Sequence, residues 1–272
     1  MQNDMSNEKF YAGKVIWITG ASSGIGEELA VQFSKWNVKL ILSSRRKDEL
    51  ERVKALLSLK SEDVAIIPLD LGDPDSLVNK ANEALKAFGK VDILINNGGV
   101  SQRALVMETS VETDRKIMEI NYFSGVILTK ALMPSMVAAG YGHIVAISSV
   151  TGKFGFPLRS AYAASKHALH GFYETVEAEY WDKGVRTTLV CPGRISTNIS
   201  MGAIGPDGKP QNIMDHGQKY GTPVATCARD IINGVRKNKR EIFPGGKEVL
   251  MIYIKRVWPG LGYYLAKKAK RV

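Results

Sequence analysis

Short apolar runs alternate with helix-like stretches along most of the chain, and this alternation is the feature that most constrains the fold. Six runs, rich in aliphatic and β-branched residues, are predicted to be strands at 15–19, 40–43, 64–68, 91–95, 143–148 and 186–191. Because these runs are continuously apolar, they favour parallel strands covered on both faces. Right-handed β-α-β crossovers then predict an α/β fold, a doubly wound sheet of about seven strands with helices on both faces.

Length and composition are typical of a globular protein. The chain has 272 residues, 44% hydrophobic and 24% charged, and we expect a single domain over 1–272. Its two cysteines and four histidines lack disulfide or metal-ligand spacing, which predicts a reducing compartment and no metal. Cys191 is expected to be a buried packing residue, and His170 to have no ligand role. Without a signal peptide or bilayer-spanning stretch, a cytoplasmic location is expected.

The net charge of +10 is concentrated at the C-terminal end. From residue 249 onward there is no acidic residue, and there are six basic ones: Lys255, Arg256, Lys267, Lys268, Lys270 and Arg271. The rest of the chain therefore carries only +4. Because no zinc finger, RNA-binding aromatic motif or basic recognition helix accompanies this charge, we expect no nucleic-acid partner.

Two segments interrupt the alternation. Residues 194–221 are rich in glycine and proline and follow the sixth strand, at the sheet edge where such folds bind ligands. We interpret them as a substrate lid, with a plain surface excursion as the alternative. Residues 249–272 place aromatic and aliphatic residues before terminal lysines. That pattern suits a peripheral membrane contact or an acyl-chain surface, and equally a tail that packs on the domain with its lysines in solvent.

A glycine-rich turn directly follows the first predicted strand. Gly20, Gly24 and Gly26 precede a helix expected from about Glu27 to Trp36. Glycine permits a tight turn, the approach of backbone amides to a pyrophosphate and close helix–strand packing, and the helix N-terminus adds donors. The turn therefore predicts a dinucleotide site, with a simple connector as the alternative.

The end of the second predicted strand indicates which dinucleotide binds. An NAD-preferring fold places a carboxylate there to hold the ribose hydroxyls, but this chain has Ser44, Arg45 and Arg46. Guanidinium groups favour a 2′-phosphate through charge-assisted hydrogen bonds. We therefore predict NADPH/NADP+ as the cofactor, with a solvated basic turn as the alternative.

Tyr162 and Lys166 stand four residues apart on a predicted helix, so their side chains share one face. A phenol with a pKa of about 10 becomes reactive at neutral pH when a neighbouring ammonium stabilises its phenolate. Ser149 ends the fifth strand, where its hydroxyl can hydrogen-bond a substrate carbonyl, and Asn121 follows another helical stretch. Alone, the Tyr–Lys spacing is common, and a cap is the alternative role for Ser149.

Together these residues resemble the classical short-chain dehydrogenase/reductases, from about residue 13 to residue 243. The matching pieces are Thr19 to Gly26, Asp70 with Leu71, Asn96 to Gly99, Asn121, Ser149, Tyr162 with Lys166, and Pro192 to Thr197. The resemblance implies a Rossmann-type fold, an NADP(H)-dependent oxidoreductase acting on CH–OH donors, and a homodimer or homotetramer. Vertebrate members of the most similar subgroup carry an N-terminal membrane anchor, which we do not find in this sequence.

The resemblance also implies roles for the four polar residues. Tyr162 would be the general acid in carbonyl reduction, and Lys166 would lower its pKa and hold the nicotinamide ribose. Ser149 would orient and polarise the carbonyl, so that Ser149 and Tyr162 together bind the substrate. Asn121 would hold a water that links Lys166 to solvent.

The same family pattern assigns residues to the parts of the cofactor. The phosphates would be lined by Gly20, Ser22, Ser23, Gly24, Ile25 and Gly26. The adenine and its ribose would be contacted by Asp70, Leu71, Asn97 and Gly98, and the carboxamide by Ile195 and Thr197. Gly98 departs from the alanine usual at its position, which should loosen the turn without removing a functional group.

The function expected from these features is hydride transfer between NADPH and a carbonyl or secondary alcohol on a fairly apolar substrate. Acyl- or alkyl-dihydroxyacetone phosphate, steroids and retinoids are the specific substrates considered, which connects the protein with lipid metabolism. A non-catalytic NADP(H)-sensing protein of the same fold is the alternative from another class.

Overall fold

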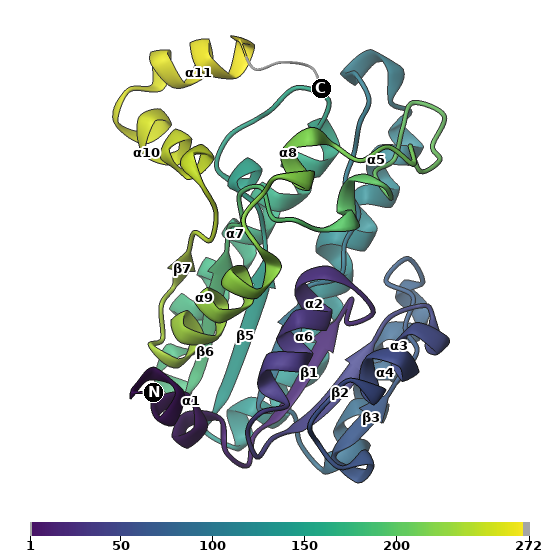
Figure 1. Ribbon diagram of the computed structural model, residues 1–272, viewed down its shortest axis with the longest axis vertical. Coiled ribbons are helices and arrows are strands. Elements are labelled where there is room, and N and C mark those ends of the chain that lie inside the picture. The colour runs from purple at the N-terminus through teal and green to yellow at the C-terminus, as the bar shows by residue number, and fades with distance from the viewer. Residues whose placement is uncertain (1, 269–272) are drawn as a thin grey trace.

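Seven parallel strands form one sheet in the computed structural model, which describes residues 2–268 (Figure 1). They are β1 (Val15–Thr19), β2 (Lys39–Ser43), β3 (Val64–Ile66), β4 (Ile93–Asn96), β5 (Gly142–Ile147), β6 (Val185–Val190) and β7 (Glu241–Ile242). Across the sheet the order is β3-β2-β1-β4-β5-β6-β7, so the winding reverses between β1 and β4. The predicted α/β doubly wound fold is confirmed.

Helices cover both faces of this sheet. They are α1 (Gln2–Tyr11), α2 (Gly24–Phe33), α3 (Lys47–Ala55), α4 (Pro74–Phe88), α5 (Val111–Met118), α6 (Ser124–Ala138), α7 (Ser160–Tyr180), α8 (His216–Lys219), α9 (Val224–Arg236), α10 (Leu250–Val257) and α11 (Pro259–Lys268). Side chains of α1, α2, α3 and α9 share one apolar core with the strands, and those of α4, α6 and α7 share the other. Ile16 and Ile18 of β1 face the first core, and Val15 and Trp17 the second, as the two-residue period of a strand requires.

Some element boundaries differ from the predicted ones. Helix α2 begins at Gly24, three residues early, because the glycine turn leads directly into the first helical turn. It ends at Phe33, and Trp36 beyond it stacks on Tyr11 of α1 with ring centroids 5.5 Å apart. The seventh strand pairs through only two residues, which is too short for an apolar pattern to show.

The carboxyl ends of the strands point to one edge of the molecule, at the top of Figure 1, where α5, α8, α10 and α11 lie. The proposed lid segment at 194–221 contains α8 and pairs with the body at two isolated bridges, Gln102 with Ile204 and Ile195 with Thr222. The tail forms α10 and α11. None of the described helices combines the length and apolarity needed to cross a bilayer.

Gly26 and Gly171 both lie in helices, but only Gly26 lies where a side chain would collide with the backbone. A Cβ on Gly26 in α2 would lie 2.4 Å from the carbonyl oxygen of Gly20, whereas a Cβ on Gly171 in α7 would meet nothing within 4 Å. We expect Gly26→Ala to lower the free energy of unfolding by about 1–3 kcal/mol through overpacking. Gly171→Ala, the matched control, should raise it by about 0.5–1 kcal/mol through helix propensity. Urea unfolding of both variants tests this, and equal shifts would contradict it.

Candidate active site

One cavity of about 1340 Å³ opens at the carboxyl edge of the sheet, across the point where the winding reverses. All but two of the predicted site residues line it, including the glycine turn, the two arginines after β2 and the Ser149–Tyr162–Lys166 group. Gly26 and Asn121 are the exceptions. A smaller cavity of about 390 Å³ beside α9 and β7 contains none of the predicted residues. Residues from the six loops that follow β1 to β6, together with Tyr162 and Lys166 of α7, thus converge at the edge where a doubly wound sheet binds ligands.

The glycine turn forms a tight cradle at the N-terminus of α2. Gly20 and Gly24 have φ values of +66° and +60°, in the left-handed region that favours glycine. A Cβ on Gly20 would lie 2.7 Å from the Cα of Gly98, so the turns after β1 and β4 touch through their backbones. Backbone amides and a helix N-terminus facing a cavity fit a pyrophosphate group. The side-chain amide of Asn97 donates to the carbonyls of Thr19 and Gly20, at 3.0 and 3.1 Å, and braces this turn.

Gly98 is in close contact with the side chain of Leu71. A Cβ there would lie 2.4 Å from Cδ1 of Leu71, which also lines the cavity. Glycine therefore lets Leu71 pack directly on the turn, at the place predicted for the adenine. The expected loosening of the turn is offset by this contact.

Two unpaired guanidinium groups stand after β2. Arg45 and Arg46 are exposed, line the cavity and form no ion pair within residues 2–268. Arg52, further along in α3, is by contrast held by Glu27 and Glu49 at 2.9 and 2.8 Å. Arg45 and Arg46 can therefore meet an added anion without first breaking an ion pair.

Tyr162, Ser149 and Lys166 form the polar centre of the cavity. Ser149 lies close enough to the Tyr162 hydroxyl to lower the pKa of the phenol, and Lys166 Nζ lies 5.7 Å from the Tyr162 ring centroid. Ser149 Oγ also accepts from the backbone N–H of Thr151 at 3.2 Å, so Ser149 caps the short turn after β5 as well. Lys166 Nζ donates to the carbonyl oxygen of Ile147 at 2.7 Å. All three side chains are nine-tenths or more buried, so the few polar contacts they make govern their charge states.

Burial dominates the titration of both helix residues. It raises the pKa of Tyr162, and the hydrogen bond from Ser149 and the charge of Arg159 partly oppose this rise. Burial lowers the pKa of Lys166 to about 8. A protonated phenol thus lies beside an amine that titrates near neutrality. The prediction that Lys166 lowers the pKa of Tyr162 stays a prediction, because here Lys166 donates to Ile147 instead.

Asn121 lies behind the cavity wall, in a π-helical turn over Glu119–Phe123 between α5 and α6. Its Oδ1 accepts from the backbone N–H of Val100 at 2.8 Å, and its Nδ2 donates to Ser165 Oγ at 3.1 Å. A Cβ on Gly99 would lie 2.9 Å from Asn121 Oδ1 and 3.7 Å from Lys166 Nζ. Glycine therefore keeps open the space between these two groups, where the linking water is predicted.

Comparison with known proteins identifies the family. The family model described as short chain dehydrogenase matches residues 14–204. The chain belongs to the short-chain dehydrogenase family. It is 39% identical over 271 residues to dehydrogenase/reductase SDR family member 7B from Mus musculus, covering 97% of this chain and 84% of the mouse protein. The predicted resemblance is confirmed.

Solved structures agree with the fold of this short-chain dehydrogenase. A short chain dehydrogenase/reductase from Burkholderia phymatum in complex with NAD has a TM-score of 0.81 at 24% identity, with 92% and 95% of the two chains covered. A short chain dehydrogenase from Burkholderia cenocepacia in complex with NADP has a TM-score of 0.77 at 22% identity, with 94% and 98% covered. At these identities the likeness concerns the fold.

Gln102 is a site residue of this short-chain dehydrogenase that the sequence did not indicate. It is fully buried, and its Oε1 accepts from the backbone N–H groups of Ala161 and Tyr162 at 2.9 and 3.2 Å. It therefore caps the first turn of α7, where the preceding residue, Arg159, makes no side-chain cap. The cap fixes the backbone of Tyr162 from a loop 60 residues earlier in the chain.

A charged triplet forms another part of the cavity wall. Arg103 Nε donates to Asp215 Oδ2 at 2.9 Å, and an Arg159 guanidinium nitrogen lies 3.4 Å from the same oxygen. Burial, together with the charge of Arg103, lowers the pKa of Arg159 to about 10. One carboxylate therefore faces two cations, which leaves this wall net positive. Because Asp215 belongs to the proposed lid, the triplet also fastens that segment to the body.

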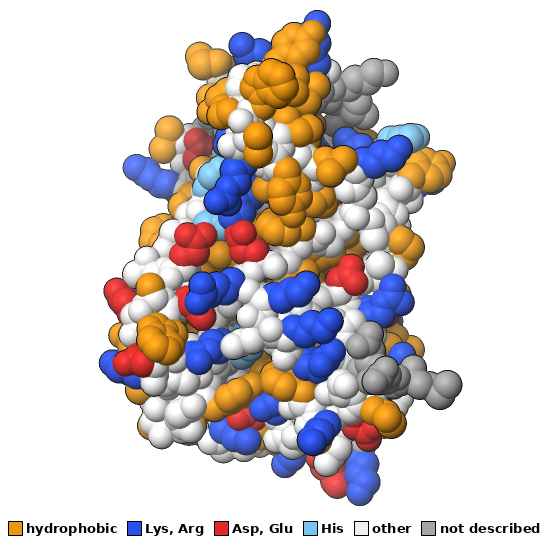
Figure 2. Space-filling model, turned by 90° about the vertical axis from the view of Figure 1, so that its left-hand side faces the viewer, with side chains coloured by type: hydrophobic (Ala, Val, Ile, Leu, Met, Phe, Trp, Pro, Cys, Tyr) orange, Lys and Arg blue, Asp and Glu red, His pale blue; other side chains and the backbone are white. Residues whose placement is uncertain are grey.

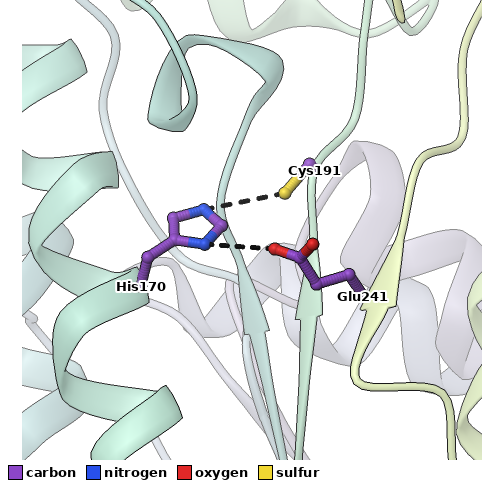
Figure 3. Close-up of side chains that lie close together, drawn as sticks. All are labelled: His170, Cys191 and Glu241. Carbon is purple, nitrogen blue, oxygen red and sulfur yellow. Dashed lines mark hydrogen bonds and ion pairs between the residues drawn. The ribbon is translucent and has the colours of Figure 1, made fainter. Parts of the chain in front are cut away.

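His170 bridges a thiol and a carboxylate next to the active site (Figure 3). Its Nε2 lies 3.7 Å from Cys191 Sγ and 3.0 Å from Ser148 Oγ, and its Nδ1 lies 3.4 Å from Glu241 Oε1. These are the one group of candidate metal ligands among residues 2–268. Nε2 of His170 faces Cys191 and Ser148, whereas Nδ1 faces Glu241 at ion-pair distance without hydrogen-bond geometry, and Lys153 ion-pairs with Glu241. We therefore interpret the group as a polar bridge between α7 and β7. Cys191 is fully buried, as predicted, and burial raises its pKa to about 12.

Glu241 makes the stability of this bridge depend on pH. The nearby His170 ring, together with Lys153, lowers the pKa of Glu241 to about 2, against an ordinary value of 4.5. The stabilisation is therefore complete above about pH 4.5 and is lost as the pH falls toward 2. We expect Glu241→Gln to lower the free energy of unfolding at pH 7 by about 2 kcal/mol, and the difference from wild type to shrink in acid.

Denaturant unfolding between neutral and acid pH measures this difference. Glu62→Gln, a carboxylate 77% exposed, is the control and should leave the profile unchanged. A loss in Glu241→Gln that stays constant with pH would contradict the expectation.

Proposed function

We propose that this short-chain dehydrogenase is an NADP(H)-dependent oxidoreductase that transfers hydride between the nicotinamide and a carbonyl or secondary alcohol on a fairly apolar substrate. The observation that carries the proposal is the buried Tyr162–Ser149 pair, with Lys166 beside it, in the same cavity as the glycine turn. A proton donor and a dinucleotide cradle in one cavity are what a hydride transfer to a carbonyl requires.

Each polar residue has a task in carbonyl reduction. When bound, the nicotinamide cofactor supplies the hydride. Tyr162, kept neutral by its raised pKa, gives its hydroxyl proton to the carbonyl oxygen, and Ser149 orients that oxygen by a hydrogen bond. Lys166, with a pKa of about 8, would restore the proton to Tyr162. Asn121 would connect Lys166 to solvent through a water held beside Gly99.

Two features support NADP(H) as the cofactor. Ser44 stands where a carboxylate would hold the ribose hydroxyls, and Arg45 and Arg46 are free to bind a 2′-phosphate. Related folds occur with either dinucleotide, so the preference rests on these side chains. We expect the preference for NADP(H) to come from the two guanidinium groups, which would neutralise the 2′-phosphate.

The cavity wall favours a particular substrate class. Its apolar part is formed by Val100, Phe154, Phe156, Ile199 and Met251. Arg103 and Arg159 add a net positive charge near Tyr162. An acyl- or alkyl-dihydroxyacetone phosphate, which has an apolar chain, a ketone and an anionic group, matches both features. Steroids and retinoids match the apolar part alone.

Removing the Tyr162 hydroxyl should separate catalysis from cofactor binding. We expect Tyr162→Phe to reduce turnover by about 10²- to 10⁴-fold, the usual contribution of a positioned general acid, with NADPH affinity unchanged. NADPH oxidation across a panel of ketones, aldehydes, steroids, retinal and acyl-dihydroxyacetone phosphate gives the rate, and fluorescence titration gives the affinity. Tyr180→Phe, on the same helix but outside the cavity, is the control. A wild-type protein that binds NADPH and turns over no panel member would favour the sensing protein instead.

Charge at the end of β2 should set cofactor preference. We expect the double variant Arg45→Ala/Arg46→Ala to bind NADPH at least about tenfold more weakly, since a charge-assisted hydrogen bond is worth about 1.5–3 kcal/mol, and to bind NADH almost as before. Titration of both dinucleotides measures the ratio. Lys60→Ala, a cation on the surface outside the cavity, should change neither affinity. Equal losses for NADPH and NADH would refute the assignment.

A further inference from the structure

The last two helices, α10 and α11, form a hairpin at the carboxyl edge of the sheet (Figure 1). They pack on each other at Gly262, where a Cβ would lie 2.9 Å from the Cα of Lys255. Gly262 is the one buried residue among residues 250–268. The hairpin is therefore held mainly by its own contact and turns most of its side chains outward.

Its outer surface is unusually apolar. Seven large side chains are between 37% and 85% exposed: Leu250, Tyr253, Val257, Trp258, Leu261, Tyr263 and Tyr264. The spacing of Leu250, Tyr253 and Val257 places them on one face of α10. In Figure 2, hydrophobic side chains gather at the top of the molecule, where the hairpin lies, with basic side chains beside them. A contiguous apolar patch of this kind marks an interaction site.

The inner side of the hairpin reaches the active-site cavity. Met251 of α10 and Leu265 and Ala266 of α11 line that cavity. Lys255 Nζ donates to the carbonyl oxygen of Lys153 at 2.9 Å, in the loop after β5. The hairpin thus separates the cavity from the apolar outer patch by the thickness of one helix pair.

Charge indicates what covers the patch. Residues 250–268 contain Lys255, Arg256, Lys267 and Lys268 and no acidic residue. A second copy docked through the same patch by two-fold symmetry would bring these cations together, which is unfavourable. An anionic bilayer surface attracts them, and tyrosine and tryptophan side chains favour the boundary between head groups and acyl chains.

We propose that the α10–α11 hairpin lies in the surface of an anionic membrane and brings the mouth of the active-site cavity to the bilayer. An apolar substrate then passes from the lipid along the inner side of the hairpin into the cavity, a step that rests on the proposed function. Docking itself depends only on the outer patch.

Vesicle flotation of the full chain tests docking without any turnover. We expect the protein to float with vesicles of phosphatidylcholine and phosphatidylserine, and to stay behind with phosphatidylcholine alone or at high salt. Val257→Ser/Trp258→Ser should lower the partition coefficient at least about tenfold by removing exposed apolar area. The matched control, Val106→Ser/Met107→Ser, removes two side chains 70% and 95% exposed elsewhere and should behave as wild type.

Several outcomes would overturn the proposal. The wild-type protein could fail to float with anionic vesicles, or the two double variants could lose the same share of the partition coefficient. Sedimentation could also show a self-association that Val257→Ser/Trp258→Ser abolishes. The last outcome would assign the patch to a second copy of the chain.

Turnover then tests the path of the substrate. With a long-chain ketone presented in anionic vesicles, Val257→Ser/Trp258→Ser should raise KM and leave kcat unchanged. With a short, water-soluble ketone both constants should equal those of wild type, because neither residue lines the cavity. An unchanged KM for the vesicle-borne ketone would contradict the path while leaving docking intact. If the proposed function is wrong, the wild-type protein should reduce neither ketone and should still float with anionic vesicles.

Discussion

The contact between the turns after β1 and β4 is the constraint on which the site depends. At Gly20 and Gly98 the two backbones approach so closely that a Cβ on Gly20 would overlap the other turn. The contact occurs where the winding of the sheet reverses, and the large cavity opens across that point. Asn97 then ties the two turns through its side-chain amide. Helix α2 begins at Gly24, with its N-terminus facing the cavity, because Gly20 and Gly98 carry no Cβ at this junction.

The chemistry of the site depends on two buried polar side chains and on the few polar groups that contact them. Tyr162 and Lys166 are buried on one face of α7, where Ser149 lies beside the phenol and the Ile147 carbonyl accepts from Lys166. Behind them, Ser148 links the Lys166 carbonyl to His170, which continues the network to β7. Elements far apart in the sequence are therefore joined at the point where positional accuracy matters most.

The sequence alone was sufficient for features that are local. The glycine turn, the strand runs and the four-residue spacing of Tyr162 and Lys166 each depend on neighbours within one element, and the structure brings them into one cavity. Contacts between residues far apart in the sequence could not be predicted. Gln102 caps α7 across 60 residues, and Arg103 meets Asp215 across 112, with no periodicity or motif to indicate either pairing. The tail composition suggested two opposite roles, and only the fold shows that one side lines the cavity while the other is exposed.

The sharing of Asp215 by Arg103 and Arg159 has a consequence for the binding of anions in the cavity. If the lid segment moves away, its carboxylate leaves two largely buried guanidinium groups without a counter-charge, which is costly. An anion that enters the cavity can replace the carboxylate and remove that cost. Anion entry and lid opening are then coupled by the same free energy in both directions. At equilibrium, a substrate with an anionic group would therefore favour release of Asp215 from the two arginines, whereas a neutral substrate would leave that ion pairing in place.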